Sequence, residues 1–335
     1  MIISFKSVFD NLRANKAWRD FPRQADKRCA DGWLWPHVRP SFTIDPAEKP
    51  AIFTIGSCFA RNIEDALAPL GFELPTWRFI TPAHELAGRL SHGMLNEFNP
   101  GSMRQRILYA LEGREFDDQT LVPAPGGTFA DLLLVRGTDV SWERAQERRR
   151  EVHEVYRQLA RCPFVLMTLG LSEAWYDHQA QLYINRMPPF AFMEQSPDRY
   201  SLRKLSAEDC FVLMEPAIAA LVERQIKVIL TVSPVPLTTT MTLVDAITAN
   251  EASKAALRLC VERLCRQFPQ VDYFPSYEIV RSGGLWSYLD DHIHVKPELI
   301  HRITKYMVDA YCSRIDATGA VANDGSEAFN YYDGH

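Results

Sequence analysis

A serine and a cysteine stand side by side after a glycine in the segment AIFTIGSCFARN, residues 51–62. The apolar run before Gly56 predicts a strand, and the pattern after Cys58 predicts a helix, with the glycine permitting a tight turn. A serine in this place can act as a nucleophile, because the backbone N–H groups of Ser57 and Cys58 lie at a helix start, where they can hold an oxyanion. Ser57 can equally be the N-cap of the helix. Cys58 is an alternative nucleophile, because a helix N-terminus favours the thiolate.

A base and an orienting acid for such a serine occur late in the chain, in the segment DDHIHV, residues 290–295. Asp291 and His294 are three residues apart, so on a turn the carboxylate can reach one imidazole nitrogen and leave the other for the serine. His292 is the competing candidate for the base. A surface cluster of polar residues has the same composition, so this spacing alone indicates chemistry only weakly.

The elements that would position these residues are apolar runs separated by amphipathic segments. Strands are predicted at 51–55, 131–135, 163–170, 227–234 and 271–274. Helices are predicted after Ser57, after Ser141 over about 18 residues, at 207–224, after a capping box formed by Thr248 and Glu251, and at 296–315.

Strands that alternate with helices and read as continuous apolar runs indicate a parallel sheet covered on both faces. We therefore predict an α/β fold, a three-layer α/β/α sandwich with a mostly parallel central sheet of about five strands. Ligands bind such sheets beyond the carboxyl ends of the strands. Ser57, Gly170 with Ser172, and Ser233 with Pro234 follow predicted strands and are expected at this edge.

Composition excludes several classes of function. The net charge of -5 argues against a nucleic-acid-binding surface. The seven cysteines include no Cys-x-x-Cys pair and no zinc-like spacing, which predicts a reduced, cytoplasmic protein without a metal or cofactor. No apolar run has the length of a membrane span, and the N-terminus lacks the apolar core of a signal peptide. The oligomeric state is not specified by these features.

Three parts are predicted along the chain. Residues 1–48 are rich in Trp, Arg, Lys and Pro and are expected to form an extension packed on the domain. Residues 49–315 carry the alternating strands and helices and form the domain. Residues 316–335 are polar and rich in small residues, which predicts a flexible tail.

The segment TIGSCFA resembles the signature of the GSCFA family, which is similar to a branch of the SGNH (GDSL-like) hydrolases. The resemblance continues in order over roughly residues 50–300, in the segments FNPGS (98–102), TLGLSEAWYD (168–177), SPVPLTTT (233–240), ANEASKAALR (249–258), YFPSYEIV (273–280) and DDHIHV. It implies an SGNH or flavodoxin-like sandwich, with Ser57 as nucleophile, His294 as base and Asp291 as the acid that orients it.

The resemblance also implies an oxyanion hole that includes an asparagine amide, but Ser172 stands where that asparagine is expected. A hydroxyl can donate one hydrogen bond, with a shorter reach. Asn99 in FNPGS is a second candidate donor, beside the backbone N–H of Cys58. Gly56 and Gly170 are expected to shape the pocket.

Other polar and aromatic residues of these segments have two interpretations each. Glu173 either hydrogen-bonds the loops that shape the pocket or is a buried acid with a raised pKa; we expect the former. Asn250 and Lys254 are expected to be a helix cap and a solvated lysine. Four aromatic residues could line an acyl or sugar site, although aromatic residues in such numbers more often belong to the hydrophobic core. They are Trp175, Tyr176, Phe190 and Phe192.

These observations predict an SGNH-like serine hydrolase or O-acyltransferase. It would act through an acyl-enzyme on Ser57. The substrate would be an O-acyl ester of a small molecule or carbohydrate-like compound, with acetyl as the expected acyl group. The alternative is a non-catalytic module that binds a carbohydrate or a partner and retains the fold and the serine. The missing asparagine favours this alternative modestly.

Overall fold

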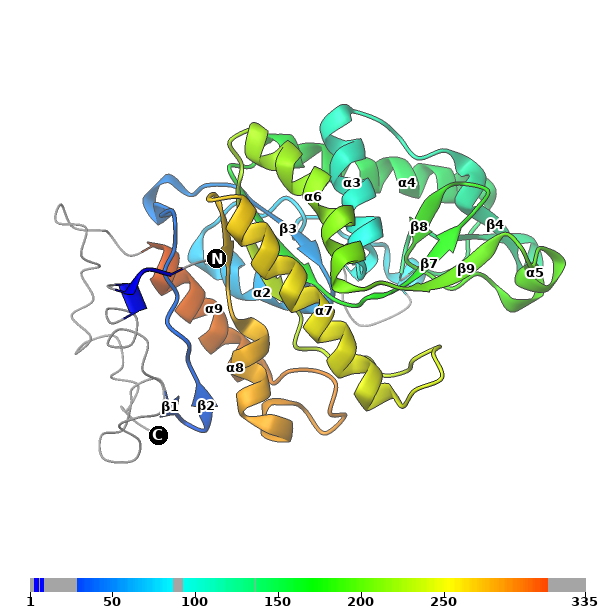
Figure 1. Ribbon diagram of the computed structural model, residues 1–335. Coiled ribbons are helices and arrows are strands. Elements are labelled where there is room, and N and C mark those ends of the chain that lie inside the picture. The colour runs from blue at the N-terminus through cyan, green and yellow to red at the C-terminus, as the bar shows by residue number, and fades with distance from the viewer. Residues whose placement is uncertain (1–2, 6, 9–28, 87–92, 136, 313–335) are drawn as a thin grey trace.

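The computed structural model describes residues 3–5, 7–8, 29–86, 93–135 and 137–312 (Figure 1). The predicted tail, 316–335, lies outside the described residues, as does the part of the predicted extension at 9–28.

A four-stranded parallel sheet of order β11-β10-β6-β3 forms the centre of the domain. Its strands are β3 (Ile52–Gly56), β6 (Phe164–Leu169), β10 (Lys227–Val232) and β11 (Val271–Tyr273). In register, Gly56 lies opposite Thr168, and Thr168 lies opposite Thr231, so the carboxyl ends of three strands meet at one edge. The fold is the predicted α/β/α sandwich, with four central strands where about five were expected.

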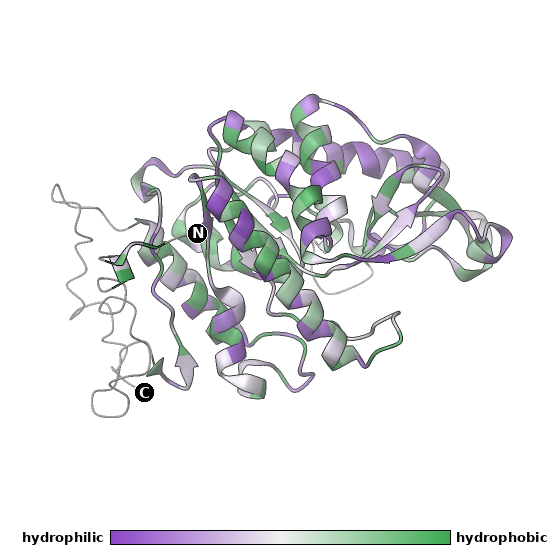
Figure 2. Cartoon of the chain, in the orientation of Figure 1, coloured by the Kyte–Doolittle hydropathy of each residue, from purple (hydrophilic) through white to green (hydrophobic). Residues whose placement is uncertain are grey.

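Alternate side chains of the central strands enter two separate cores, since successive residues of a strand face opposite ways. One face, with Phe53, Val165 and Val228, packs under four helices: α3 (Pro100–Glu112), α4 (Trp142–Arg157), α6 (Ala207–Glu223) and α7 (Ala246–Gln267). The other face, with Ile52 and Leu166, packs under α2 (Cys58–Leu67), α8 (Ser276–Ser282) and α9 (Pro297–Cys312). In Figure 2 hydrophilic colour covers much of α4, while the central strands are hydrophobic.

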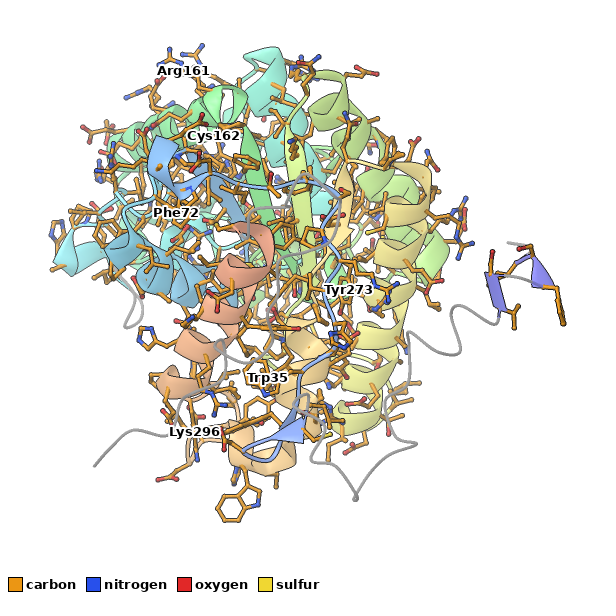
Figure 3. All side chains as sticks on the ribbon, turned by 90° about the vertical axis from the view of Figure 1, so that its left-hand side faces the viewer. Trp35, Phe72, Arg161, Cys162, Tyr273 and Lys296 are labelled. Carbon is orange, nitrogen blue, oxygen red and sulfur yellow. The ribbon has the colours of Figure 1, made fainter. Side chains whose placement is uncertain are left out.

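The segment before β3 packs against the second core. It contains the short hairpin β1 (Cys29–Ala30) and β2 (Trp33–Leu34). The side chains of Trp35, Phe42 and Ile44 are buried there, and Trp35 makes an edge-on ring contact with Tyr306 of α9. Figure 3 faces this side of the molecule and labels Trp35.

Two antiparallel units lie beside the central sheet. The hairpin of β4 (Leu121–Ala124) and β5 (Thr128–Asp131) is followed by a three-stranded sheet of order β8-β7-β9, which lies near it at the side of the molecule away from the termini (Figure 1). Its elements are β7 (Glu173–Asp177), β8 (Leu182–Ile184), α5 (Phe190–Gln195) and β9 (Tyr200–Lys204). Short 3₁₀ helices cover Pro46–Glu48, Ala68–Leu70, Ala83–Glu85, Gly93–Leu95, Asp118–Thr120, Pro125–Gly127, Gln158–Arg161 and Gly284–Ser287.

Two sequence predictions are wrong in detail. Residues 131–135 do not form a strand of the central sheet: β5 ends at Asp131, and the leucines after it lie in a buried turn, Leu132 and Leu133 in a small third core and Leu134 in the main core. The run was apolar because it is buried, not because it is extended. The predicted capping box is also wrong, because Asp245 is the N-cap of α7 and Thr248 lies inside the helix.

No helix in the described parts of the chain has both the length and the apolar character that a membrane crossing requires. In the same residues, no group of three or more His, Cys, Asp or Glu side chains is arranged to hold a metal ion.

Candidate active site

Ser57 lies between the end of β3 and the start of α2, where it is the N-cap of the helix. Its Oγ accepts the N–H of Phe59 at 3.3 Å. The preceding Gly56 has a φ of +149°, and a Cβ added to it would lie 2.5 Å from the carbonyl oxygen of Thr168. A larger residue does not fit beside β6, so the glycine is required by close packing and by its backbone conformation.

A cavity of about 450 Å³ opens at this edge of the sheet. Ser57 and Cys58 line it from the end of β3, Gly170 from the end of β6, Ser233 from the end of β10, and His294 from the loop before α9. The cavity thus lies beyond the carboxyl ends of the parallel strands, where ligands bind such sheets. Ser57 and Cys58 are both buried, and Ser57 donates its hydroxyl hydrogen to Ser233 Oγ at 3.1 Å.

Asp291 holds the imidazole of His294 through one of its two ring nitrogens. Nδ1 of His294 lies 2.5 Å from Oδ2 of Asp291, and Oδ1 of Asp291 accepts the N–H groups of Ile293 and His294 at 2.9 Å. These bonds, the one from the His294 side chain first, hold the pKa of Asp291 well below its ordinary value. Nε2 of His294 is thereby the nitrogen left for a substrate or a serine.

His294, and not His292, shares the cavity with Ser57. His292 is exposed and has a φ of +54°, which directs its side chain differently from that of His294. Within residues 29–86 and 93–312, apart from residue 136, no hydrogen bond joins Ser57 to His294; the Ser57 hydroxyl bonds Ser233 instead.

The oxyanion candidates differ in position. Asn99 lines the cavity, but it is also the N-cap of α3: its Oδ1 accepts the N–H of Ser102 at 2.8 Å, and its Nδ2 donates to Asn185 Oδ1 at 3.3 Å. Ser172 is 1% exposed and is absent from the cavity lining. The expectation that its hydroxyl faces the cleft is therefore wrong. Ser172 lies in a bend before β7, where its backbone N–H donates to Ser253 Oγ at 2.8 Å, whereas Glu173, the first residue of β7, lines the cavity.

Glu173 and Gly170 contact the neighbouring loops, as expected of residues that shape the pocket. The carboxylate of Glu173 accepts the hydroxyl of Thr240 at 2.5 Å and the N–H of Met241 at 3.2 Å. A Cβ on Gly170 would lie 2.8 Å from the carbonyl oxygen of Phe98. The bonds of Glu173 hold the loop after β10 at the cavity, and the absence of a side chain at Gly170 lets the Phe98 segment approach it closely, where the N–H of Leu171 donates to the Phe98 carbonyl oxygen at 2.8 Å.

The expectations of a helix cap at Asn250 and a solvated Lys254 are wrong, because both side chains are buried within α7, whose N-cap is Asp245. Lys254 is 1% exposed, and its Nζ donates to the carbonyl oxygens of Gly170 at 2.7 Å and Val235 at 2.8 Å. Burial lowers its pKa to about 7. Asn250 accepts the N–H of Leu237 at 2.9 Å through Oδ1. A signal was present, because Lys254 follows Asn250 by four residues and Leu257 follows Lys254 by three, a spacing that places all three on one face of the helix.

Asn185, after β8, was also missed. Its Oδ1 accepts the hydroxyl of Ser102 at 2.9 Å and the N–H of Phe98 at 3.3 Å, and its Nδ2 donates to the carboxylate of Glu97. Glu97 in turn forms a buried ion pair with Arg106 at 2.8 Å. Nothing in the local sequence around Asn185 distinguishes it, because its partners come from a distant segment.

Comparison with known proteins gives a family and two distant structural likenesses. No curated protein matches the chain. A GDSL-like lipase from Bacteroides thetaiotaomicron VPI-5482 aligns at a TM-score of 0.37 and 10% identity, over 78% of this chain and 89% of that one. A mutant acetyl-xylooligosaccharide esterase from Geobacillus Stearmophilus aligns at a TM-score of 0.32 and 11% identity, over 78% and 94%.

The GSCFA family model matches residues 51–306, a range that contains the cavity, the serine and histidine that line it, and the helix that anchors its loops. The chain belongs to the GSCFA family.

Proposed function

We propose that the protein is an SGNH-like serine esterase or O-acyltransferase that acts through an acyl-enzyme on Ser57. The observation that carries the proposal is the cavity that Ser57 shares with His294, whose Nδ1 is held by Asp291. A nucleophile, a base and an orienting acid in this order are the parts that acyl transfer requires.

In the first step, Nε2 of His294 accepts the hydroxyl proton while Ser57 Oγ bonds to the ester carbonyl carbon. For this the Ser57 hydroxyl turns from Ser233 toward His294. The electron pair of the carbonyl moves onto its oxygen, and we propose that the backbone N–H groups of Ser57 and Cys58, at the start of α2, stabilise this oxyanion. Because the helix dipole places positive charge at this end, the negative charge is favoured there.

In the second step, the oxyanion collapses and the bond to the alcohol breaks. The alcohol leaves with the proton from His294, and the acyl group stays on Ser57. Water or a second hydroxyl group then gives a proton to His294 while its oxygen bonds to the acyl carbon. The bond between that carbon and Ser57 Oγ breaks, the acid or the new ester leaves, and His294 returns the proton to Ser57 Oγ. The substrate we propose is an O-acyl ester of a small molecule or carbohydrate-like alcohol.

Labelling with a fluorophosphonate tests the proposal, because this reagent reports an activated serine. The full chain should form an adduct on the peptide that contains Ser57, and Ser57→Ala should form none. Cys58→Ala is the matched control, since it removes the neighbouring nucleophile and should keep the adduct. If instead Cys58→Ala loses the label and Ser57→Ala keeps it, Cys58 is the nucleophile.

A non-catalytic binding module is the second candidate. It is favoured by the hydrogen bond from Ser57 to Ser233 in place of His294, and by the buried position of Ser172 where the superfamily uses an amide. Absence of any fluorophosphonate adduct, together with no hydrolysis of any acyl ester by a folded protein, would establish this candidate over the enzyme.

A further inference from the structure

Three apolar side chains form a row across the β8-β7-β9 sheet. Trp175 of β7 lies directly opposite Ile184 of β8 on one side and Leu202 of β9 on the other. Residues opposite one another in antiparallel strands project from the same face of a sheet. All three line the cavity that contains Ser57, so the row forms one continuous apolar wall.

This wall is not the face that the sheet turns to the main core. Ala174 and Tyr176, which alternate with Trp175, project from the other face and pack with Tyr183 into the main core. On the Trp175 face, Leu182 and Ile184 are buried in the small core beside the β4–β5 hairpin, and Trp175 packs against that core. The row marks the place where that packing stops and the cavity begins.

A second wall of the cavity is also apolar. Leu237 and Met241 line it from the loop after β10, which Asn250 and Glu173 hold in place. That loop contacts the start of β7, because Glu173 accepts the hydroxyl of Thr240 and the N–H of Met241. Met241 is 51% exposed at the rim, where its unbranched thioether can adapt to different ligands.

The size of the cavity exceeds what an acetyl ester needs. At about 30 Å³ for each small group, a volume of about 450 Å³ holds on the order of 15 non-hydrogen atoms. An acetyl group places a single methyl beyond its carbonyl and would leave both apolar walls in contact with water. Exposure of so much apolar surface in a cavity is unfavourable unless a ligand covers it.

We propose that the two apolar walls bind the acyl chain of the substrate, and that the acyl group is of medium length, on the order of eight carbons. The inference rests on the proposed esterase or acyltransferase function. The carbonyl lies against Ser57, the chain runs between the Trp175 row and Leu237, and the alcohol leaves through the opening beside the half-exposed His294.

Hydrolysis of p-nitrophenyl esters from acetate to dodecanoate by the full chain tests this. Each methylene that becomes buried should raise kcat/KM by roughly fourfold, until the walls are covered near eight carbons. If kcat/KM for the acetate ester equals that for the octanoate ester, the chain-length proposal is refuted, while the proposed esterase function stands.

Substitutions in the apolar walls test whether these walls cause the chain-length preference. Leu202→Thr should lower kcat/KM for octanoate by roughly tenfold and leave acetate nearly unchanged. Leu285→Thr is the matched control, because Leu285 is exposed and lies outside the cavity lining. Met241→Gln at the exposed rim is a second variant that does not threaten folding, and it should also shift the preference toward shorter chains. Unchanged chain-length profiles in both wall variants would refute the assignment.

Binding separates this proposal from the catalytic one. By calorimetry, Ser57→Ala should bind octanoate at least tenfold more tightly than butyrate. If octanoate binds in this way but no ester is hydrolysed and no serine is labelled, the acyl site stands and the enzymatic function fails. If neither carboxylate shows the preference, the acyl site is refuted whatever the activity.

Discussion

Replacement of Lys254 by methionine tests the anchoring role of α7 through its dependence on pH. The lysine is fully buried, and its Nζ donates to the carbonyl oxygens of Gly170 and Val235. Methionine keeps much of the length and volume of the side chain but has no donor and no charge. Each carbonyl left without its partner should cost about 1–3 kcal/mol of stability.

The sign of the pH dependence follows from the burial of the ammonium group. Burial lowers the pKa of Lys254 from 10.5 to about 7, and nearby Cys58 and Glu251 offset this only partly. Between these two pH values the unfolded chain binds more protons than the folded protein, so the stability of the wild type rises with pH. The destabilisation by the buried charge is fully present below the folded pKa and disappears as the pH approaches the unfolded one.

The expected magnitude is measurable by urea unfolding. From about pH 6 to about pH 9, the stability of the wild type relative to Lys254→Met should increase by about 2–3 kcal/mol. Lys204→Met is the control, because Lys204 is exposed on β9. A wild-type advantage that is the same at both pH values would refute the buried-charge argument, and an advantage that shrinks as the pH rises would reverse it.

Three further substitutions address the cavity walls and the acid. Asn185→Leu should destabilise the protein by about 2–4 kcal/mol in urea unfolding, because the carboxylate of Glu97 and the N–H of Phe98 lose a buried partner; a change below about 0.5 kcal/mol would contradict this. Gly170→Ala should slow fluorophosphonate labelling by about tenfold or more, since its Cβ would lie 2.8 Å from the Phe98 carbonyl oxygen; labelling at the wild-type rate would show that the loop relaxes. Asp291→Asn should reduce the labelling rate by on the order of 100-fold with little loss of stability, because the exposed carboxylate orients His294; an unchanged rate would remove Asp291 from the mechanism.

The central sheet was predictable because its strands are buried on both faces. The runs at 51–55, 163–170, 227–234 and 271–274 became β3, β6, β10 and β11. Parallel strands that are buried on both faces have continuous apolar sequences, and other elements of similar length seldom have such sequences. The run at 131–135 imitates one, because its leucines are buried in a turn beside the β4–β5 hairpin. Apolar composition reports burial, and only the surrounding fold decides whether the buried segment is extended.

The site was predictable where its contacts are local. Asp291 and His294 lie three residues apart, so one turn of chain suffices to pair them. Ser57 was predictable because a strand end and a helix start are both visible in the sequence around it. The burial of the Ser172 side chain was not predictable, because it depends on where the preceding loop ends and β7 begins. The helical spacing of Lys254 indicated a buried face, but its two hydrogen-bond partners lie 84 and 19 residues away, and no local pattern identifies them.

The first turns of α7 connect the candidate catalytic edge to the proposed acyl walls. Lys254 holds the carbonyl of Gly170 at the end of β6 and the carbonyl of Val235 after β10. Asn250 holds the N–H of Leu237 in the apolar wall. Every one of these bonds is made to a backbone atom, so the helix determines the path of both loops without depending on their side chains. Substitution of Leu237 can therefore change the size and polarity of the cavity while Gly170 and Val235 keep their positions, and the chain-length preference should be alterable without loss of the catalytic geometry.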